Sequence, residues 1–172
     1  MSRPLGYLSY SDACAFMYGI LDNSGGFVQG VYTNYSQHVD SCKSFKIVDA
    51  KTPHVRLEFE DRNESKHIRQ DAYEVGKGIN CEHIWPQSQL KKAGIPEAVC
   101  DLHHMIPANV KVNGVRSNYK FGEVEDSIAN LYGSGDFDSK SEFDKKGKIF
   151  EPCERSKGNI ARALFYIADT YS

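Results

Sequence analysis

An adjacent carboxylate and imidazole, Glu82 and His83, are followed later in the chain by an asparagine and an arginine, Asn113 and Arg116. A neutral histidine with an ordinary pKa of about 6.5 can accept a proton from an attacking water molecule. Carboxylate and amide oxygens are ligands for a hard cation such as Mg²⁺, and arginine suits a phosphate group. These residue types together indicate hydrolysis of a phosphodiester bond with the help of one divalent metal ion.

Each signal also has a simpler explanation when it is taken alone. Asn113-Gly114 is more often a turn than a metal-binding sequence. Arg116 is equally well placed for an ion pair with Glu123 or Glu125 on the same predicted helix. The case for a site therefore depends on the elements that carry these residues.

Two strands and a helix are predicted around the candidate residues. The segment Ile79 to Leu90 contains Pro86 and predicts a short strand that runs into a loop. Leu102 to Ile106 predicts a second short strand, stopped by Pro107. The pattern from Asn113 to Val124 is compatible with a helix. The predicted local order is strand, strand, helix.

The remaining elements are predicted to pack around this unit. Apolar residues fall on one helical face from Ser11 to Asp22, and Phe27 to Tyr35 indicates a strand or extended segment. Val55 to Glu60 alternates apolar and charged residues, as a half-buried strand does. The pattern from Ser156 to Tyr171 predicts an amphipathic helix, with Ser156 as its N-cap.

Length and composition predict one ordinary domain. The chain has 172 residues, of which 40% are hydrophobic, enough for one core. Its uncharged apolar stretches are shorter than the roughly 20 residues that a membrane span needs. No secretory signal is visible at Met1 to Gly6. We therefore expect a non-membrane protein of one domain.

The charge balance restricts how the chain meets nucleic acid. The 21 basic and 23 acidic residues give a net charge of −2, so a global positive field is absent and phosphate affinity has to be local. Arg155, Lys157 and Arg162 lie in or near the first turns of the last predicted helix, where the helix dipole also attracts anions. Lys157 and Arg162 are therefore candidate phosphate-binding residues.

The five cysteines are an odd number at irregular spacing. A dense disulfide framework is not expected from such a pattern, and at least one cysteine stays unpaired within the chain. One bridge, such as Cys81 to Cys100, remains open.

The motifs resemble, in their order, those of the endonuclease I family of non-specific nucleases. The similar segments are residues 81–88, 101–107, 112–119, 121–123, 150–152 and 157–162. The resemblance implies an α+β fold in which a ββα-metal, or His-Me, finger at about residues 79–125 is joined by packing helices, all in one domain spanning residues 1–172.

The resemblance also assigns roles to residues. It implies that His83 is the general base, that Glu82 and Asn113 bind the metal, and that Arg162 contacts phosphate, a role that Arg116 fits as well. The remaining motif residues are expected to support the site from behind; they are Asp101, His103, His104 and Asn118. Trp85 and Pro86 are expected to hold the finger in place rather than to stack on bases.

The implied activity is cleavage of DNA with little sequence preference, leaving 5′-phosphate and 3′-hydroxyl ends. Contacts with phosphate and sugar would accept RNA as well, and double- or single-stranded substrates. The implied cofactor is Mg²⁺, whose site would also admit Mn²⁺ or Ca²⁺. We expect a monomer, with an inhibitor protein as a further partner. The resemblance implies secretion or a periplasmic location, although no signal peptide is visible.

A zinc-stabilised interaction module is the main alternative. A tetrahedral site for structural zinc would need four side chains; the candidates are Cys81, His83, Cys100 and His103. This alternative leaves Glu82 and Asn113 without a metal role, and it does not explain residues 112–118. Measurement of bound zinc distinguishes the two hypotheses.

Overall fold

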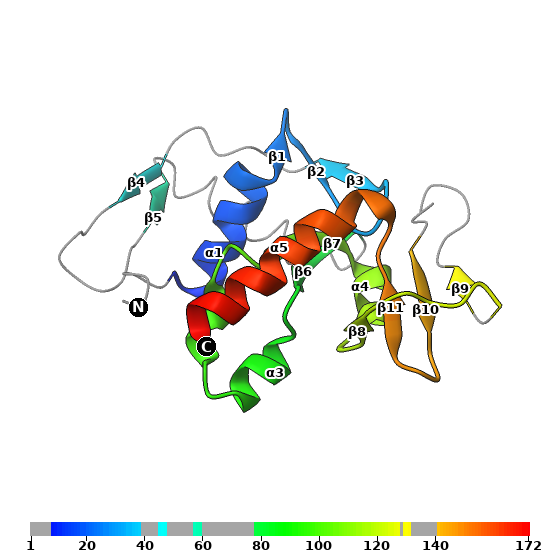
Figure 1. The fold of residues 1–172 in the computed structure, drawn as a ribbon. Coiled ribbons are helices and arrows are strands. Elements are labelled where there is room, and N and C mark those ends of the chain that lie inside the picture. Colours follow the sequence, from blue (N-terminus) through cyan, green and yellow to red (C-terminus); the bar gives the residue numbers. More distant parts are fainter. Residues whose placement is uncertain (1–7, 39–44, 48–56, 60–77, 128, 132–140) are drawn as a thin grey trace.

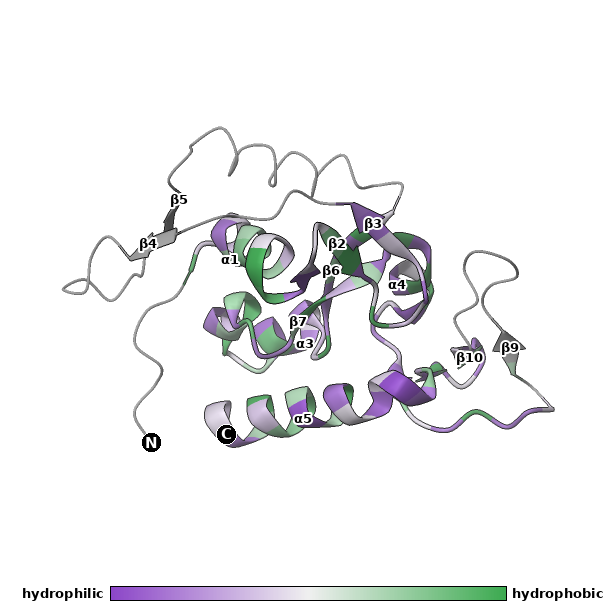
Figure 2. Ribbon diagram, turned by 90° about the horizontal axis from the view of Figure 1, so that it is seen from above, coloured by the Kyte–Doolittle hydropathy of each residue, from purple (hydrophilic) through white to green (hydrophobic). Residues whose placement is uncertain are grey.

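The computed structural model describes residues 8–38, 45–47, 57–59, 78–127, 129–131 and 141–172. It is an α+β structure, as predicted. Strands β6 (Ile79–His83) and β7 (Met105–Asn109) lie centrally. Helix α5 (Glu154–Tyr171) runs along one side of them, whereas α1 (Tyr10–Phe16) and α4 (Val110–Arg116) lie on the other (Figures 1 and 2).

The strands form four small sheets. Strands β6 and β7 pair antiparallel, and so do β4 (Phe45–Ile47) and β5 (Leu57–Phe59). A three-stranded sheet has the order β1-β2-β3 and a four-stranded sheet the order β8-β11-β10-β9. Their bounds are β1 Asn23–Ser24, β2 Phe27–Gln29, β3 Ser36–His38, β8 Lys120–Phe121, β9 Asn130–Leu131, β10 Glu142–Asp144 and β11 Ile149–Glu151.

Strands β6 and β7 and helix α4 follow one another in the predicted order, but the bounds of β7 and of α4 differ from the prediction. The second strand begins at Met105 and runs through Pro107, which was predicted to stop it. Proline is tolerated because a two-stranded sheet consists of edge strands only. Helix α4 begins at Val110 because the Asn109 side chain accepts hydrogen bonds from the backbone N–H groups of Lys111 and Val112. The helix already ends at Arg116, well before the predicted end.

The segment between β6 and β7 is more helical than predicted. Helix α3 spans Gln87–Lys92, and a 3₁₀ turn spans Pro96–Cys100. Pro86 occupies the N-cap of α3, and the helix buries Leu90 alone. A six-residue helix with one buried residue has no apolar stripe for a sequence pattern to reveal.

The first predicted helix is confirmed but changes geometry along its length. Ser9 caps α1 by accepting a hydrogen bond from the backbone N–H of Asp12, and a π-helical turn over Met17–Leu21 follows. Ala13 and Met17 are buried, as predicted, whereas Leu21 is exposed. Buried residues therefore continue along the element as far as Gly19, and its end is exposed.

Helix α5 is amphipathic, as predicted, but its cap differs. It begins at Glu154 after an N-cap at Cys153, so Ser156 lies inside the first turn, where its hydroxyl donates to the Val31 carbonyl. Its buried face carries Ile160, Ala163 and Ile167. Hydrophobic and hydrophilic residues both occur along α5 (Figure 2).

Each of two segments predicted to be extended contains a strand. Of the strand predicted over Val55 to Glu60, β5 covers Leu57–Phe59 and the rest lies outside the described residues. The extended segment predicted from Phe27 to Tyr35 contains β2, over Phe27–Gln29.

Within the described ranges, no helix combines the length and the apolar character that a bilayer crossing requires.

Candidate active site

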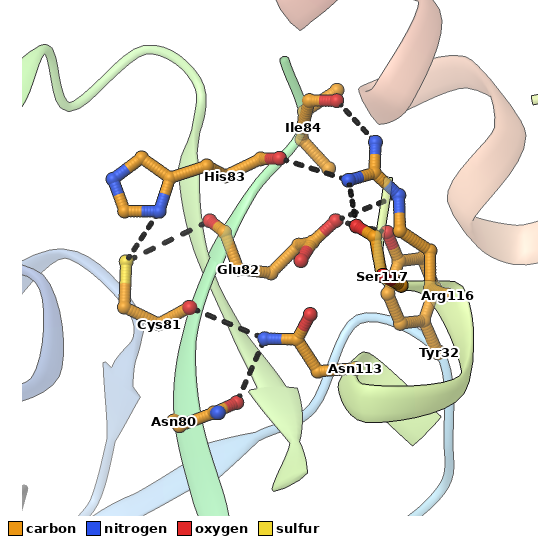
Figure 3. Close-up of polar contacts among 9 residues, drawn as sticks. All are labelled: Tyr32, Asn80, Cys81, Glu82, His83, Ile84, Asn113, Arg116 and Ser117. Carbon is orange, nitrogen blue, oxygen red and sulfur yellow. Dashed lines mark hydrogen bonds and ion pairs between the residues drawn. The ribbon is translucent and has the colours of Figure 1, made fainter. Parts of the chain in front are cut away.

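A pocket of about 350 Å³ lies where β6 ends, between the start of α3 and the end of α4. Five of the predicted site residues line it, and these are Glu82, His83, Asn113, Arg116 and Asn118. Its other lining residues are Cys81, Pro86, Gln87, Ser88 and Ser117. Figure 3 shows the polar contacts among the residues at its centre. The pocket therefore collects the candidate base and both candidate metal ligands.

Glu82 is a buried carboxyl group, with 2% of its surface exposed. The Tyr32 hydroxyl donates a hydrogen bond of 2.7 Å to its Oε1 atom, and Nε of Arg116 lies 3.2 Å from the same oxygen. Burial raises the pKa of Glu82 to about 7, although Arg116 and Tyr32 oppose the shift. A cation bound at this carboxylate would favour its charged form and lower that pKa.

Arg116 is buried as well, with 2% of its surface exposed. Its terminal nitrogens donate hydrogen bonds to the backbone carbonyls of His83 at 3.3 Å, Ile84 at 2.5 Å and Ser117 at 3.0 Å. Its Nε forms the ion pair with Glu82 but no hydrogen bond of normal geometry to any described residue. The guanidinium thus ties α4 to the end of β6 and to the carboxylate.

These contacts bear on both sequence hypotheses for Arg116. The alternative of an ion pair with Glu123 or Glu125 is wrong, because the partner is Glu82 and α4 ends before either residue. The phosphate-binding role stays a prediction. Four contacts with protein oxygens already surround the guanidinium, which suits a positioning role for Glu82 better than a phosphate contact.

His83 is held in one tautomer by its neighbours. Its Nε2 lies 2.9 Å from the Val99 carbonyl oxygen, and a carbonyl can only accept, so Nε2 carries the proton. Nδ1 is therefore the unprotonated nitrogen. It lies 3.2 Å from the side-chain nitrogen of Gln87 and 3.8 Å from Sγ of Cys81, and both of these residues line the pocket.

The imidazole of His83 is also enclosed, with 5% of the residue exposed. Tyr10 stacks on it with ring centres 5.8 Å apart, and His104 meets it edge to face at 5.4 Å. Burial, together with His104 and the positive charges of Arg116 and Lys91, lowers the pKa of His83 to about 4. The ring is therefore neutral at pH 7, as a general base has to be.

Asn113 is oriented by two hydrogen bonds to β6. Its Nδ2 donates to the Asn80 side-chain oxygen at 2.9 Å and to the Cys81 carbonyl at 3.2 Å. With its nitrogen committed to the strand, the amide oxygen points toward the carboxylate of Glu82 (Figure 3). Two oxygen ligands from neighbouring elements thus face one another.

The base and the metal ligands leave β6 on opposite sides. Successive residues of a strand point to opposite faces, and the His83 ring lies on one side of β6 while Glu82 and Asn113 lie on the other (Figure 3). The pocket reaches both sides because the strand ends at His83. In the conformation described, Glu82 and Asn113 therefore lie on the same side of β6, and the imidazole of His83 lies on the other side.

The oxygen pair fits a hard cation better than zinc. A carboxylate and an amide oxygen are ligands that suit Mg²⁺, which keeps several waters and needs few protein ligands. Among the described residues, no group of three or more His, Cys, Asp and Glu side chains is arranged to share a metal ion. The alternative zinc set does not assemble, since the His103 ring stacks on Tyr166 with centres 4.0 Å apart.

The residues predicted to support the site from behind lie at different places. Asp101 accepts hydrogen bonds from Tyr166 and Tyr171 of α5, at 3.1 and 2.9 Å, and from the exposed His103. His104 is buried and reaches the site through its ring contact with the predicted base. Asp101 therefore connects the 101–104 segment with α5 instead of lining the pocket.

Two predicted phosphate-binding residues lie outside the pocket. Arg162 donates to the Asn159 side chain one turn earlier on α5 and lines a different hollow. Lys157 forms ion pairs with Glu151, at 2.8 Å, and with Glu154. Their predicted role in phosphate binding stays a prediction.

Sequence reasoning missed several neighbours of the candidate residues. Tyr32 lies 50 residues before Glu82 in the chain, and its local sequence does not mark it as a partner of that carboxyl group. Val99 contacts His83 through its backbone carbonyl, and a backbone contact cannot be predicted from the type of residue. Gln87 could have been found, because it follows His83 by one helical turn and could reach back to the ring.

The described cysteines are free thiols, and they are Cys14, Cys81, Cys100 and Cys153. The bridge between Cys81 and Cys100 that the sequence left open is therefore not formed. Cys42 lies outside the described residues.

Comparisons with known proteins give the chain its family. A family model described as Endonuclease I matches residues 19–172. Endonuclease-1 of Buchnera aphidicola subsp. Acyrthosiphon pisum (strain APS) is 33% identical over 136 residues, which are 77% of this chain and 48% of the relative. The extracellular ribonuclease of Bacillus subtilis (strain 168) is 33% identical over 63% of the chain and 34% of its own length.

A periplasmic deoxyribonuclease of Aeromonas hydrophila is 30% identical over 58% of the chain and 41% of its own length. The chain thus spans about half or less of the length of these curated relatives. The family model, by contrast, covers nearly all of the chain. The chain belongs to the Endonuclease I family.

Proposed function

We propose that this chain is a metal-dependent endonuclease that hydrolyses phosphodiester bonds in DNA, and in RNA as a second substrate, with little sequence preference. The observation that carries the proposal is the pocket in which the oxygens of Glu82 and Asn113 face one another and which His83 also lines. The family supports the reaction class. The relatives' names include a ribonuclease and a deoxyribonuclease, which supports both substrates.

In the proposed mechanism, Glu82 and Asn113 hold the divalent ion. Bound there, Mg²⁺ supplies charge neutralisation for the phosphate and for the leaving oxygen. Arg116 and Tyr32 keep the Glu82 carboxylate in place, and Asn80 keeps the Asn113 oxygen turned toward it. The protein thereby presents a prearranged pair of oxygens and does not reorganise them during the reaction.

His83 is the proposed base, acting through Nδ1. The Val99 carbonyl keeps the proton on Nε2, so Nδ1 can take the proton of the water molecule that attacks phosphorus. Gln87 occupies Nδ1 in the conformation described, so its side chain has to give way to that water. Cleavage of the bond from phosphorus to the 3′ oxygen, which takes up a proton from solvent water, leaves 5′-phosphate and 3′-hydroxyl ends.

Recognition is proposed to rest on the nucleic-acid backbone. Phosphate contacts carry no sequence information, so cleavage should show little preference, and binding should weaken steeply as salt rises. Two of the relatives are named extracellular or periplasmic proteins. By extension, we propose that this chain also acts outside the cytoplasm.

Incubation of a plasmid with the protein tests the proposal. We expect nicking and linearisation with Mg²⁺, no cleavage with EDTA, and loss of most turnover in His83→Ala with DNA binding retained. Products should be joined by a ligase that requires 5′-phosphate ends. Full turnover in His83→Ala would overturn the role of the base, and cleavage undiminished by EDTA would overturn the role of the metal.

A further inference from the structure

A second, smaller hollow adjoins the candidate active site. Pro86 and Arg116 line both hollows, so the two lie on either side of these residues, near the start of α3 and the end of α4. Three aromatic residues line the second hollow, and they are Trp85, Tyr119 and Phe121. Its remaining walls are Ile84, Gln89, Lys120 and Leu164. We refer to this hollow as the aromatic pocket.

Packing and hydrogen bonds hold two side chains of the aromatic pocket, Trp85 and Arg116, in place. Trp85 is half-buried and packs against the core cluster that contains Leu90 and Ile167, while also lining the pocket. The Arg116 guanidinium lies over the Phe121 ring, 4.5 Å from its centre. Because that guanidinium is fixed by backbone carbonyls, the wall that separates the two pockets is held in place.

Polar groups complete the lining. Lys120 and Gln89 are exposed residues of the aromatic pocket. Aromatic and aliphatic walls with a few polar groups suit a flat heterocycle that also carries hydrogen-bonding atoms. A lysine beside such walls adds attraction for a neighbouring phosphate. Together these features match one nucleotide.

We propose that the aromatic pocket binds an unstacked nucleobase next to the phosphate that is cleaved. The inference rests on the proposed function, because it places the base of the substrate strand beside the candidate active site. It revises the expectation that Trp85 only holds the finger in place. A base inside a duplex is paired and stacked on both faces, so it has to be unstacked before it can enter such a pocket. The protein is therefore expected to favour single-stranded over double-stranded nucleic acid.

Trp85 is the single tryptophan of the chain and reports directly on its own pocket. The experiment titrates the His83→Ala variant, in EDTA, with a short single-stranded DNA and follows tryptophan fluorescence. A second titration uses a strand of the same length in which every base is replaced by an abasic spacer, so that no register can place a base in the pocket. We expect quenching by the intact strand, and no quenching and roughly tenfold weaker binding with the abasic strand, as the loss of one stacked base predicts.

Two variants separate the pocket from general packing. Tyr119→Leu keeps an apolar side chain but removes a stacking surface, and it should weaken single-strand binding roughly tenfold. Phe165→Leu is the matched control, because Phe165 is 76% exposed on α5 and is not among the residues of the aromatic pocket. It should bind like the parent protein.

The proposal is overturned if the abasic strand binds and quenches as the intact strand does, or if Tyr119→Leu binds single strands as the parent does. Equal affinity for a duplex of the same sequence would overturn it as well. Binding is measured without metal and without turnover, whereas the proposed function is tested by plasmid cleavage. Failure of base binding is therefore distinguished from failure of the proposed function.

Discussion

Tyr32→Phe removes one oxygen atom from the environment of the candidate metal site. Tyr32 is completely buried, and its ring packs against Phe150 with centres 4.9 Å apart, so phenylalanine can keep the same packing. What is lost is the 2.7 Å hydrogen bond to Oε1 of Glu82. The substitution therefore tests whether this hydroxyl holds the carboxylate for a metal ion.

The size of the effect follows from the type of hydrogen bond. A hydrogen bond to a charged group contributes about 1.5–3 kcal/mol, and about 1.4 kcal/mol corresponds to a tenfold change in an equilibrium constant. Arg116 still accompanies the carboxylate in the variant, which limits the loss. We expect the Mg²⁺ concentration for half-maximal cleavage to rise roughly ten- to a hundredfold, the range found when partners of metal ligands are removed.

The assay is the initial rate of plasmid cleavage over a series of Mg²⁺ concentrations at one pH. At saturating Mg²⁺ the rate of Tyr32→Phe should return close to that of the parent, because the hydroxyl orients a ligand and does not touch the substrate. Tyr166→Phe is a matched control, since it removes a similar 3.1 Å hydrogen bond to the carboxylate of Asp101, outside the pocket. Its Mg²⁺ dependence should not change.

A half-maximal Mg²⁺ concentration that stays within about threefold of the parent value would refute the reasoning, since the hydrogen bond would then do nothing for the metal ligand. A rate that stays low at every Mg²⁺ concentration, in a folded variant, would also refute it. That second result would place Tyr32 in the chemical step.

Three further substitutions test the neighbouring contacts. Asn80→Ala frees the amide of Asn113 and should raise the half-maximal Mg²⁺ concentration roughly tenfold in the same assay. Arg116→Met leaves a buried carboxyl without its ion-pair partner and should lower the free energy of unfolding in urea by about 3–5 kcal/mol at pH 8. The pKa of Glu82, about 7, lies above its ordinary value, so metal-free protein should lose stability as pH rises from about 4.5 to 7. Glu82→Gln should remove that loss, and its stability relative to the parent should grow by up to about 3 kcal/mol across this range in urea unfolding.

The parts of the site that sequence reasoning predicted are those joined by local structure. Glu82 and His83 are adjacent, and strand β7 pairs back onto them through Ile106 and Met105. Helix α4 follows β7 without a gap. Asn113 lies about one turn into this helix and contacts β6, the strand of Glu82 and His83. The expectation that Glu82 and Asn113 act together came from the family resemblance of these ordered motifs, and the local structure explains why the two residues meet.

The parts that were missed depend on contacts between distant segments. Tyr32 lies 50 residues before Glu82 in the chain, and nothing in its local sequence marks it as a partner of a carboxylate, so only the packed structure reveals the contact. The same holds for Arg116, for which the sequence left open a phosphate contact and an ion pair along its own helix. The early end of α4 leaves the guanidinium facing β6, where the buried Glu82 competes successfully for it.

Because the Glu82 carboxyl group is buried, its charge depends on the hydrogen-bond donors and cations around it. A carboxyl group with the exposure of Glu82 would stay protonated at neutral pH unless donors or cations surrounded it, and its pKa of about 7 marks a near balance between burial and its two donors. A bound divalent ion would favour the ionised form of Glu82, so metal binding and ionisation of this carboxyl group are coupled. Metal affinity should therefore increase with pH up to about 7 and then level off, while His83, with a pKa of about 4, stays neutral throughout that range.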